Sequence, residues 1–447
     1  MTQKQTQAQA QAQAQTQTQT QTQTQTQTHS TVRAVNHLTA RWAARAASGG
    51  GGTVLTAAGV WPLLALLADG SAGPARDELA QALGIPAEDA AAAARELLAA
   101  LDGVRGLRAA TGLWAAADLP LEEGWSAKLP PGSRGTLTGD LEGDGKVLDG
   151  WASDRTGGLI ERMPVTLRPD TRLVLASALA LTLKWAEPFR EFPGHVSDGP
   201  WAGRSLRQLV HTTSSLAPVR VAEGPAGPVT ILAVTGAEDM DMDVHLLLGG
   251  PAAPAAEVLA TGIAATRGAL PSVGGDALPD GSPGPGLGIA TVDAFSPQPR
   301  LCVTTVAFSL SAEHDLLEDA SLFGLLTATD SDYGHFPGIS TSPLAISSAR
   351  QSAMARFHAA GFEAAAVTAI AARPAGAARQ PGHRARRAEV RFDRPFGFLA
   401  VHRASGLVLA AGWVTDPDPA AEHRRGAAGP LAPPPRSGAR PPAPPSH

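Results

Sequence analysis

The sequence lacks the cysteines that a disulfide framework or a cysteine-rich zinc site would require. Cys302 is the only cysteine among 447 residues, and a lone cysteine is most often a small, buried, apolar side chain. A large excess of charge of one sign is also absent. A net charge of −5 creates no extended field that would gather nucleic acid on the surface. We therefore expect no nucleic-acid partner.

Long apolar runs are absent as well. No stretch of about 18 uncharged apolar residues occurs, so we expect no membrane span. The first 28 residues alternate Gln with Thr or Ala, whereas a signal peptide has a basic start, an apolar centre and small residues at its end. No export signal can be read, which leaves a cytoplasmic location open beside an extracellular one.

Catalytic signatures are missing from the chain. There is no G-x-S-x-G elbow, no H-E-x-x-H pair and no phosphate-binding loop. The glycine-rich stretch from Gly284 to Gly288 has no strand before it and no helix after it, and Pro285 removes an amide donor that a phosphate would need. We expect this stretch to be a loop, and we expect the protein to be neither an enzyme nor a cofactor carrier.

Composition divides the chain into two tails and a folded body. Residues 1–30 have almost no apolar bulk, and residues 418–447 are rich in Pro, Ala and Arg, so neither tail can offset the entropy of becoming ordered. The whole chain is 43% hydrophobic and 17% charged, which suits a globular protein. We predict disordered tails around one large domain that spans residues 31–417.

Periodicity places helices early and strands late in that domain. Apolar residues recur at helical spacing in segments 36–47, 60–67, 73–84, 88–101 and 148–162. Strands are predicted at residues 172–184, 239–248, 301–311, 391–401 and 407–414. Because the two kinds of element are segregated along the chain, they predict an α+β fold rather than alternating βαβ units.

The strand at 239–248 alternates with a strict period of two. Five apolar side chains would point to one side, whereas the other side would carry Asp239, Asp241, Asp243 and His245. Oxygen and imidazole groups of this kind can hold a metal ion. A solvated face of a half-buried strand is the simpler interpretation, and it is the one we adopt.

Two blocks in the first half of the chain have a recognisable pattern. The first is LLADGSAGPARDELAQALGIP at residues 66–86, where one helix ends at a glycine and another begins. The second joins LDGWASDRTGGLIERM to DTRLVLASALALTLKWAEPF, with Trp151, Thr156 and Gly158 at a characteristic spacing and Trp185 at the end of a strand.

Two further blocks follow in the second half. Residues 322–370 contain the motif FPGIS and lead to an alanine-rich loop. The block VRFDRPFGFLAVHRASGLVLAAGWVTDP then closes the domain. The order and content of the four blocks resemble the serpin family of serine protease inhibitors, in a bacterial-type member, and the resemblance covers about residues 34–417. The resemblance implies a large central mixed sheet with further sheets, a helical N-terminal portion and an exposed reactive-centre loop.

The loop at residues 359–390 can be interpreted from its length and side chains, without reference to the family. It is a long connection between two predicted strands, and connections of this length in a compact protein are usually functional or disordered. Its small side chains would permit both an exposed loop and a strand threaded between other strands. The resemblance implies a hinge here, formed by Gly361, Phe362, Glu363, Ala364, Ala365, Ala366 and Thr368.

The resemblance also implies a suicide substrate. A serine protease would attack the loop and form an acyl ester, and the first half of the loop would then insert into the main sheet with the enzyme attached. We expect a monomer whose partner is a serine protease. Counting forward from Gly361 places the cut between Ala375 and Gly376, which favours an elastase-like or subtilisin-like enzyme. Arg373, Arg379 and Arg384 are alternative residues before the cut, and they favour a trypsin-like enzyme.

Several positions depart from the family pattern. Phe362 stands where inhibitory members carry Thr or Ser, and an overpacked insertion point costs roughly 1 to 3 kcal/mol. In the sheet-opening region, which the resemblance assigns to Thr56, Ser177, Trp185 and Gln351, Ser177 replaces Asn and Gln351 replaces His. These side chains can still form hydrogen bonds, but the pH-dependent His is gone. A non-inhibitory serpin that acts in binding or storage is the alternative function.

Overall fold

The computed structural model describes residues 28–129, 133–163, 165–330, 334–362 and 382–420. Its first element is a helix whose described part covers residues 28–46, so residues 28–30, which we predicted as tail, are helical. At the other end, the backbone N–H of Ala420 donates to the carbonyl oxygen of Ser205, and that of Arg207 donates to Asp418. The chain is therefore docked three residues beyond the predicted boundary at 417.

The first half of the domain is mainly helical, as predicted. It contains the 3-10 turn η1 (Ala47–Gly49) and the helices α2 (Ala57–Gly70), α3 (Gly73–Leu83), α4 (Ala87–Asp102), α5 (Glu123–Ser126) and α6 (Leu141–Thr156). Helix α6 lies earlier than the predicted segment 148–162. It ends at Thr156 because Gly157 and Gly158 both adopt positive φ, at 67° and 85°.

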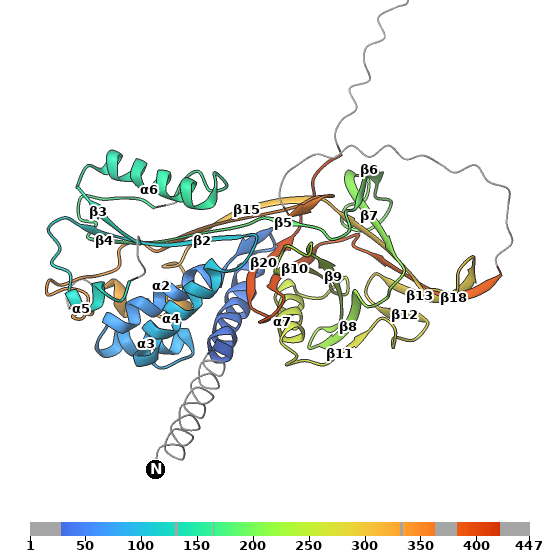
Figure 1. Cartoon of the computed structure of the whole chain (residues 1–447), viewed down its shortest axis with the longest axis horizontal. Helices are drawn as coiled ribbons and strands as arrows, with labels where there is room; N and C mark the ends of the chain where they lie inside the picture. The colour runs from blue at the N-terminus through green and yellow to red at the C-terminus, as the bar shows by residue number, and fades with distance from the viewer. Residues whose placement is uncertain (1–27, 130–132, 164, 331–333, 363–381, 421–447) are drawn as a thin grey trace, which may run out of the picture.

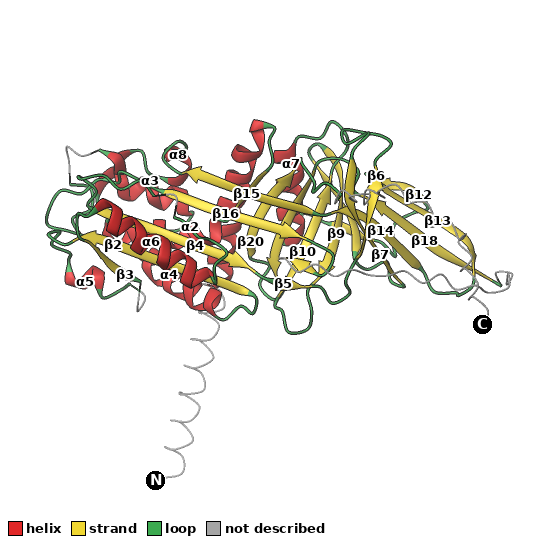
Figure 2. Ribbon diagram, turned by 90° about the horizontal axis from the view of Figure 1, so that it is seen from above, coloured by secondary structure: helices red, strands yellow, loops and turns green. Residues whose placement is uncertain are grey.

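One long layer of strands crosses the helical half. Strands β2 (Leu107–Ala116), β3 (Arg134–Leu137) and β4 (Leu173–Leu181) form a three-stranded sheet, and β15 (Phe308–Asp315) pairs with β16 (Arg350–Phe357). Figure 2 shows β15, β16, β4 and β2 side by side in this layer. Strands β4 and β16 are in contact, yet among the described residues no hydrogen-bonded ladder joins them. The layer is thus made of two half-sheets that meet at β4 and β16.

Helices cover both faces of the β2–β4 half-sheet. Figure 1 shows α6 on one side of it and α2, α3 and α4 on the other. Alternate residues of β4 therefore enter two different cores. Leu175 and Leu179 pack into the large core with α2, whereas Ala176 and Ala178 pack beneath Leu148 and its neighbours in α6. The strand is buried on both faces, which explains its continuous apolar sequence.

A second sheet of seven strands lies beneath the junction of the half-sheets. Its order is β1 (Thr53–Leu55), β20 (Val408–Val414), β19 (Phe396–His402), β10 (Met242–Leu248), β9 (Gly227–Thr235), β8 (Val219–Gly224) and β11 (Ser272–Gly274). Helix α7 (Ala255–Thr266) covers one face of it. The predicted strand at 391–401 is wrong in its first part, because the chain turns at 392–395 before β19 begins.

Strand β10 corrects the prediction of a solvated face. Its first residues alternate as expected, but His245 is only 9% exposed, and its ring lies 3.1 Å from the hydroxyl of Thr266 at the end of α7. Leu247 is fully buried on the same face. The periodicity could not show this, because the covering helix comes from a later part of the chain.

A third sheet of six strands forms the end of the molecule opposite α5. Its order is β12 (Gly281–Gly284), β13 (Leu287–Ala294), β18 (His383–Arg391), β14 (Arg300–Val306), β7 (Ser205–Thr213) and β6 (Arg190–His195). The predicted strand at 301–311 is in fact two strands, β14 and β15, separated at Ala307. The glycine-rich stretch 284–288, which we predicted as a loop, is only partly one. Pro285 and Gly286 form the turn of the β12–β13 hairpin, whereas Gly284 ends β12 and Leu287 and Gly288 begin β13.

The remaining described elements are short. They are β5 (Leu183–Lys184), β17 (Gly361–Phe362), α8 (Ala320–Phe323) and the 3-10 turn η2 (Thr327–Thr329). Cys302, expected to be buried, is half-exposed in β14. None of the helices in the described part of the chain is long and apolar enough to cross a membrane. The architecture confirms the predicted α+β class.

Candidate hinge and sheet-opening site

The hinge begins with a tight turn at the end of β16. The backbone N–H of His358 donates to the carbonyl oxygen of Gly361 at 2.9 Å, so the chain folds back on itself directly after Phe357. Gly361 and Phe362 then pair antiparallel with Lys184 and Leu183 of β5. Because β5 continues the line of β4, the described part of the loop already forms the first rung of a new ladder at this edge.

Gly361 permits this pairing because it has no side chain. A Cβ atom at this position would overlap the carbonyl oxygen of Leu183 and would lie 3.2 Å from the Cα of Lys184. Any other residue would push the hinge away from β5. The glycine is therefore required by the close approach of two backbones, and its φ is not in the left-handed region.

Phe362 is seated in the core. It is 2% exposed, and its ring centroid lies 6.0 Å from that of Phe398 in β19. A shallow cavity next to it is bordered by Leu181 of β4 and Met354 of β16. The sequence predicted overpacking at this residue. In the structure the phenylalanine is already packed among apolar side chains before any further insertion. Full burial of such a side chain contributes about 1.5 to 3 kcal/mol.

Trp185 holds the turn from the other side. Its indole Nε1 donates to the carbonyl oxygen of His358 at 2.8 Å, and its backbone N–H donates to Ala360 at 3.2 Å. The indole ring also packs against Phe357, with centroids 4.9 Å apart. Of the four residues predicted for sheet opening, Trp185 is therefore the one that supports the hinge.

The imidazole of His358 sits in this turn without a hydrogen-bond partner. The residue is 9% exposed, and both ring nitrogens are buried and unpaired. Burial lowers the pKa of His358 below its ordinary value, and the positive charge of Arg207 lowers it further, whereas Asp418 and Glu191 act in the opposite direction. The neutral ring is the form that the folded protein favours.

The other three predicted residues, Thr56, Ser177 and Gln351, lie together at some distance from Trp185. Ser177 precedes Trp185 by eight residues, which corresponds to about 26 Å of extended chain. Gln351 of β16 bonds to the residue before α2 through both ends of its amide. The backbone N–H of Thr56 donates to its Oε1 at 2.9 Å, and its Nε2 donates to the carbonyl oxygen of Thr56 at 2.8 Å. Both residues are buried. This pair ties the β15–β16 half-sheet to α2.

Ser177 of β4 completes this group by packing beside it. A Cβ on Gly59 of α2 would come within 2.5 Å of the Ser177 hydroxyl oxygen and 3.8 Å of the Gln351 amide nitrogen. The glycine thus leaves room for both polar side chains beside the helix. The hydroxyl of Thr56 remains buried without a partner, which is a local cost within an otherwise satisfied contact.

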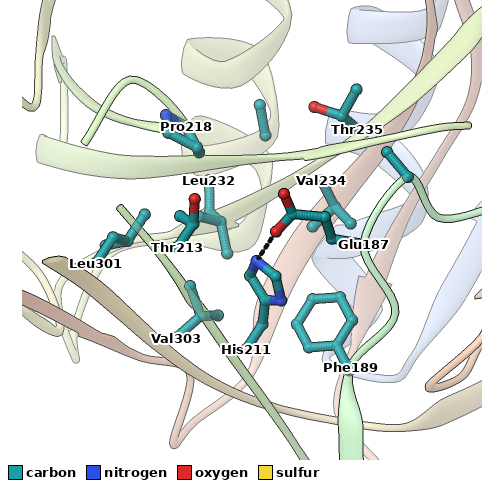
Figure 3. Close-up of a pocket in the computed structure, with 12 residues that line it drawn as sticks. Glu187, Phe189, His211, Thr213, Pro218, Leu232, Val234, Thr235, Leu301 and Val303 are labelled. Carbon is teal, nitrogen blue, oxygen red and sulfur yellow. Dashed lines mark ion pairs between the residues drawn. The ribbon is translucent and has the colours of Figure 1, made fainter. Parts of the chain in front are cut away.

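A cavity of about 270 Å³ lies behind the hinge support. Figure 3 shows its apolar wall, formed by Phe189, Leu232, Leu301 and Val303 among others, and the ion pair of Glu187 and His211 at its side. Phe189 links the cavity to the hinge, because its backbone N–H donates to the carbonyl oxygen of Ala359 at 2.8 Å.

Most of the predicted loop residues lie outside the described part of the chain. These are Glu363, Ala364, Ala365, Ala366, Thr368, Arg373, Ala375, Gly376 and Arg379. Arg384 is described, and it is the second residue of β18, paired with Asp293 of β13. Its guanidinium donates to the carbonyl oxygen of Thr291 at 3.2 Å.

In the acidic stretch considered for metal binding, two carboxylates form ion pairs with arginines. The guanidinium of Arg105 binds the carboxylate of Asp241, with its Nη2 2.5 Å from Oδ1, and the Nη2 of Arg403 lies 2.8 Å from Oδ1 of Asp243. Among the described residues no group of three His, Cys, Asp or Glu side chains is arranged to hold a metal ion. The stretch thus joins neighbouring segments through ion pairs.

A family model agrees with this architecture. The model described as "Serpin (serine protease inhibitor)" matches residues 33–196 and 300–417, more than half of the chain. The chain belongs to the serpin family. No curated protein matches it closely enough to count as a relative.

Solved serpin structures share the fold at low sequence identity. Human thyroxine-binding globulin complexed with thyroxine is 15% identical, with a TM-score of 0.66 over 88% of this chain and 100% of that one. Native protease nexin-1 with heparin is 16% identical, with a TM-score of 0.63 over 88% and 100%. A serpin from the trematode Schistosoma haematobium is 14% identical, with a TM-score of 0.61 over 87% and 99%. These likenesses show the fold alone.

Sequence reasoning missed two residues of this serpin's hinge. His358 and Leu183 both contribute backbone carbonyl oxygens to it, the first as acceptor for Trp185 and the second as the close neighbour of Gly361. A backbone role leaves no trace in side-chain identity, so no pattern in the sequence indicated them.

Proposed function

We propose that this serpin inhibits a serine protease by acting as a suicide substrate whose cleaved loop inserts between β4 and β16. One observation carries the proposal. Gly361 and Phe362 already pair with β5 at the end of the gap, while among the described residues no ladder closes the gap between the two half-sheets. A strand entering there would give both half-sheets a partner.

The existing pairing sets the register that further insertion would follow. Phe362 is opposite Leu183, so an uninterrupted antiparallel ladder would bring Ala364 opposite Leu181 and Thr368 opposite Ser177. Residues on the same face as Phe362 would enter the large core beside α2, and their neighbours would face the other side. The small residues of the hinge thereby suit the crowded face, and a threonine would reach the level of Gln351.

This register also bears on the position of the cut. Strand β4 ends at Leu173, whose partner in the continued ladder would be Ala372. Pro374 would then fall beyond the strand, where a missing N–H is tolerated, and Ala375 would follow it. A cut after Ala375 therefore gives an inserted strand that runs along the whole of β4, which at about 3.3 Å per residue is roughly 30 Å long. Arg373 and Arg379 remain the alternatives.

Arg384 is less suited to be the residue before the cut. Its backbone is part of the β13–β18 ladder, opposite Asp293, and a protease needs an extended segment that is free of other partners. We therefore favour an elastase-like or subtilisin-like target, which accepts a small residue, over a trypsin-like one.

The chemistry of trapping depends on a race between two steps. The protease serine forms an acyl ester with the residue before the cut, and water would normally release it. If insertion is faster, the ester is drawn along the sheet and the enzyme is pressed against the serpin, which displaces the donors of its oxyanion hole. Each new ladder hydrogen bond contributes about 0.5 to 1.5 kcal/mol, so the inserted form is the more stable one and the intact form is held by a kinetic barrier.

A matched pair of variants tests the inserted register. Ala366→Arg would place a charge on the face that enters the core opposite Leu179, whereas Ala365→Arg would place it on the other face, where β16 exposes Arg356 in part. With subtilisin or elastase, we expect wild type and Ala365→Arg to form complexes that survive SDS, and Ala366→Arg to be cut into two fragments. A wild-type chain that is nicked without any adduct and without a higher melting temperature would falsify the inhibitor proposal.

A second function is favoured by the seated phenylalanine. Phe362 is buried before any cut, which stabilises the intact state and reduces the gain on insertion. A serpin of this kind could act as a binding or storage module, and thyroxine-binding globulin is a structural neighbour that is solved with a bound ligand. The SDS-stable complex separates the two functions, because a binding module gives none.

We further propose that the protein is a bacterial-type member of the family and a monomer without a nucleic-acid partner.

A further inference from the structure

The strand that follows the loop has an additional partner. The hairpin of β12 and β13 adds to the side of β18, and residues 287–294 pair one by one with residues 390–383. The hairpin belongs to segment 197–299, which the serpin family model does not match. Strand β18 is thereby an inner strand, with β13 on one side and β14 on the other.

The first residues of β18 depend on the hairpin alone. The ladder with β14 begins at Arg387, opposite Arg300, so His383 through Arg386 have backbone partners only in β13. Apart from Gly382, these are the first described residues after the loop. Without the hairpin, four residues of the strand would have no ladder partner, and the connection between β17 and β18 would be longer by that much.

Arg386 reinforces this attachment. Its guanidinium donates to the carbonyl oxygens of Asp276 at 2.8 Å, Leu278 at 2.5 Å and Gly275 at 3.3 Å. Its Nε also lies 3.5 Å from a carboxylate oxygen of Asp280. One side chain thus binds the whole segment that leads into the hairpin, with charge-assisted hydrogen bonds that are stronger than neutral ones.

The carboxylate of Asp280 also contacts the hairpin. The second oxygen of Asp280 accepts from both the backbone N–H and the hydroxyl of Thr291, each at 3.0 Å. Thr291 is the residue opposite Arg386 in the ladder. Arg386, Asp280 and Thr291 therefore form a closed set of contacts across the two strands.

We propose that Arg386 and the β12–β13 hairpin anchor the far end of the loop, so that the loop can insert only after it is cut. The inference rests on the proposed insertion. An intact chain that filled the gap along the whole of β4 would have to return from there to β18, and β4 and β18 lie in opposite halves of the molecule (Figure 1). The return requires β18 to leave its sheet. A cut chain has no such requirement, because its inserted half is no longer joined to β18.

The anchor predicts a selective effect for Arg386→Ala. Intact protein is incubated just below its melting temperature, and the uncut form that no longer accepts a protease and resists urea is measured over time. We expect this form to accumulate about tenfold faster in Arg386→Ala than in wild type, because the lost contacts lower the barrier to releasing β18. Arg387→Ala is the matched control, since Arg387 is half-exposed and pairs only with Glu389 among the described ion pairs. It should behave as wild type.

A second variant covers the case in which Arg386→Ala does not fold. Val292 and Ala385 are directly opposite in the ladder, and cysteines at both positions would cross-link β13 to β18 when oxidised. The oxidised protein should convert far more slowly than the same protein after reduction. Equal rates in both redox states, or equal rates for Arg386→Ala and Arg387→Ala, overturn the anchor.

Nicked protein separates failure of the anchor from failure of the proposed function. After cleavage by subtilisin, wild type and all variants should gain the same heat resistance, because insertion of a cut loop does not involve β18. If nicked wild type gains none, the insertion mechanism itself is wrong. If nicked wild type gains it and the intact variants still convert alike, only the anchor is wrong.

Discussion

The amide of Gln351 in β16 forms hydrogen bonds with both the backbone N–H and the backbone carbonyl oxygen of Thr56, and these bonds join the β15–β16 half-sheet to the start of α2. Gln351 is 1% exposed and Thr56 is 3% exposed. Hydrogen bonds this deeply buried are costly to break, because water cannot replace the lost partner.

Gln351→Leu is therefore expected to loosen the junction of the half-sheets. It keeps an apolar volume at the site but leaves the N–H of Thr56 without a partner, at a cost of about 1 to 3 kcal/mol for this buried group. The carbonyl oxygen of Thr56 loses one of its two hydrogen bonds and still accepts from the backbone N–H of Gly59 at 3.3 Å. We expect a lower free energy of unfolding in urea and faster insertion after cleavage. Ser352→Ala, at the half-exposed next position of β16, is the control that should change neither quantity.

Gly361→Ala tests whether the hinge must approach β5 so closely. The added Cβ overlaps the carbonyl oxygen of Leu183, so β17 should leave its place and Phe362 should lose its burial. We expect a stability loss of about 2 to 3 kcal/mol, mainly from exposing the ring, and faster nicking of the intact loop by subtilisin. Gly382→Ala, at the other end of the loop, has no atom within 4 Å of the added Cβ and should be neutral. Equal effects of the two substitutions would contradict the seated hinge.

Acid should weaken the hinge through His358. Burial lowers its pKa, whereas the unfolded chain titrates near 6.5. The unfolded state therefore binds the proton first, and the stabilising contribution of the neutral ring is complete above about pH 6.5 and is lost as the pH falls towards the lowered folded pKa. Arg207 and Arg356 oppose protonation, while Asp418 and Glu191 favour it.

His358→Leu isolates this contribution. Other histidines with a lowered pKa, among them His245 at about 4, are unchanged in the variant, so they contribute equally to both proteins. Urea unfolding at pH 7.5 and pH 5 should show a smaller loss of stability for His358→Leu than for wild type. An identical loss in both would mean that His358 has no part in the response to acid.

The sequence predicted the elements whose cause is local and missed those whose cause is distant. Helix α3 follows from Pro74 at its start and Gly84 at its end, where the C-cap N–H bonds to Ala80. The burial of His245 depends instead on α7, and the break between β14 and β15 depends on which sheet each half joins. No local pattern encodes either fact.

The same division holds for the site. Gln351 was predicted to retain hydrogen bonds despite replacing a histidine, and the structure confirms this through the backbone of Thr56. The place of Phe362 could not be predicted, because it depends on Phe398 and Leu183, which come from strands far away in the chain. Sequence reasoning identified the hinge by its glycine. The glycine is needed because a larger residue would overlap a carbonyl oxygen of another strand, which the sequence does not show.

Thr56→Val tests the one unsatisfied atom in the sheet-opening group. The hydroxyl of Thr56 is buried and has no hydrogen-bond partner, and it does not cap α2, whose first residue is Ala57. Valine has nearly the same shape and leaves both backbone bonds to Gln351 in place, so removing the hydroxyl should raise the free energy of unfolding by about 1 kcal/mol. Thr56→Ser keeps the hydroxyl and removes a methyl group, so it should lower stability instead. Urea unfolding of the two variants beside wild type decides the matter, since a valine variant no more stable than wild type would mean that the hydroxyl has a partner, such as a buried water.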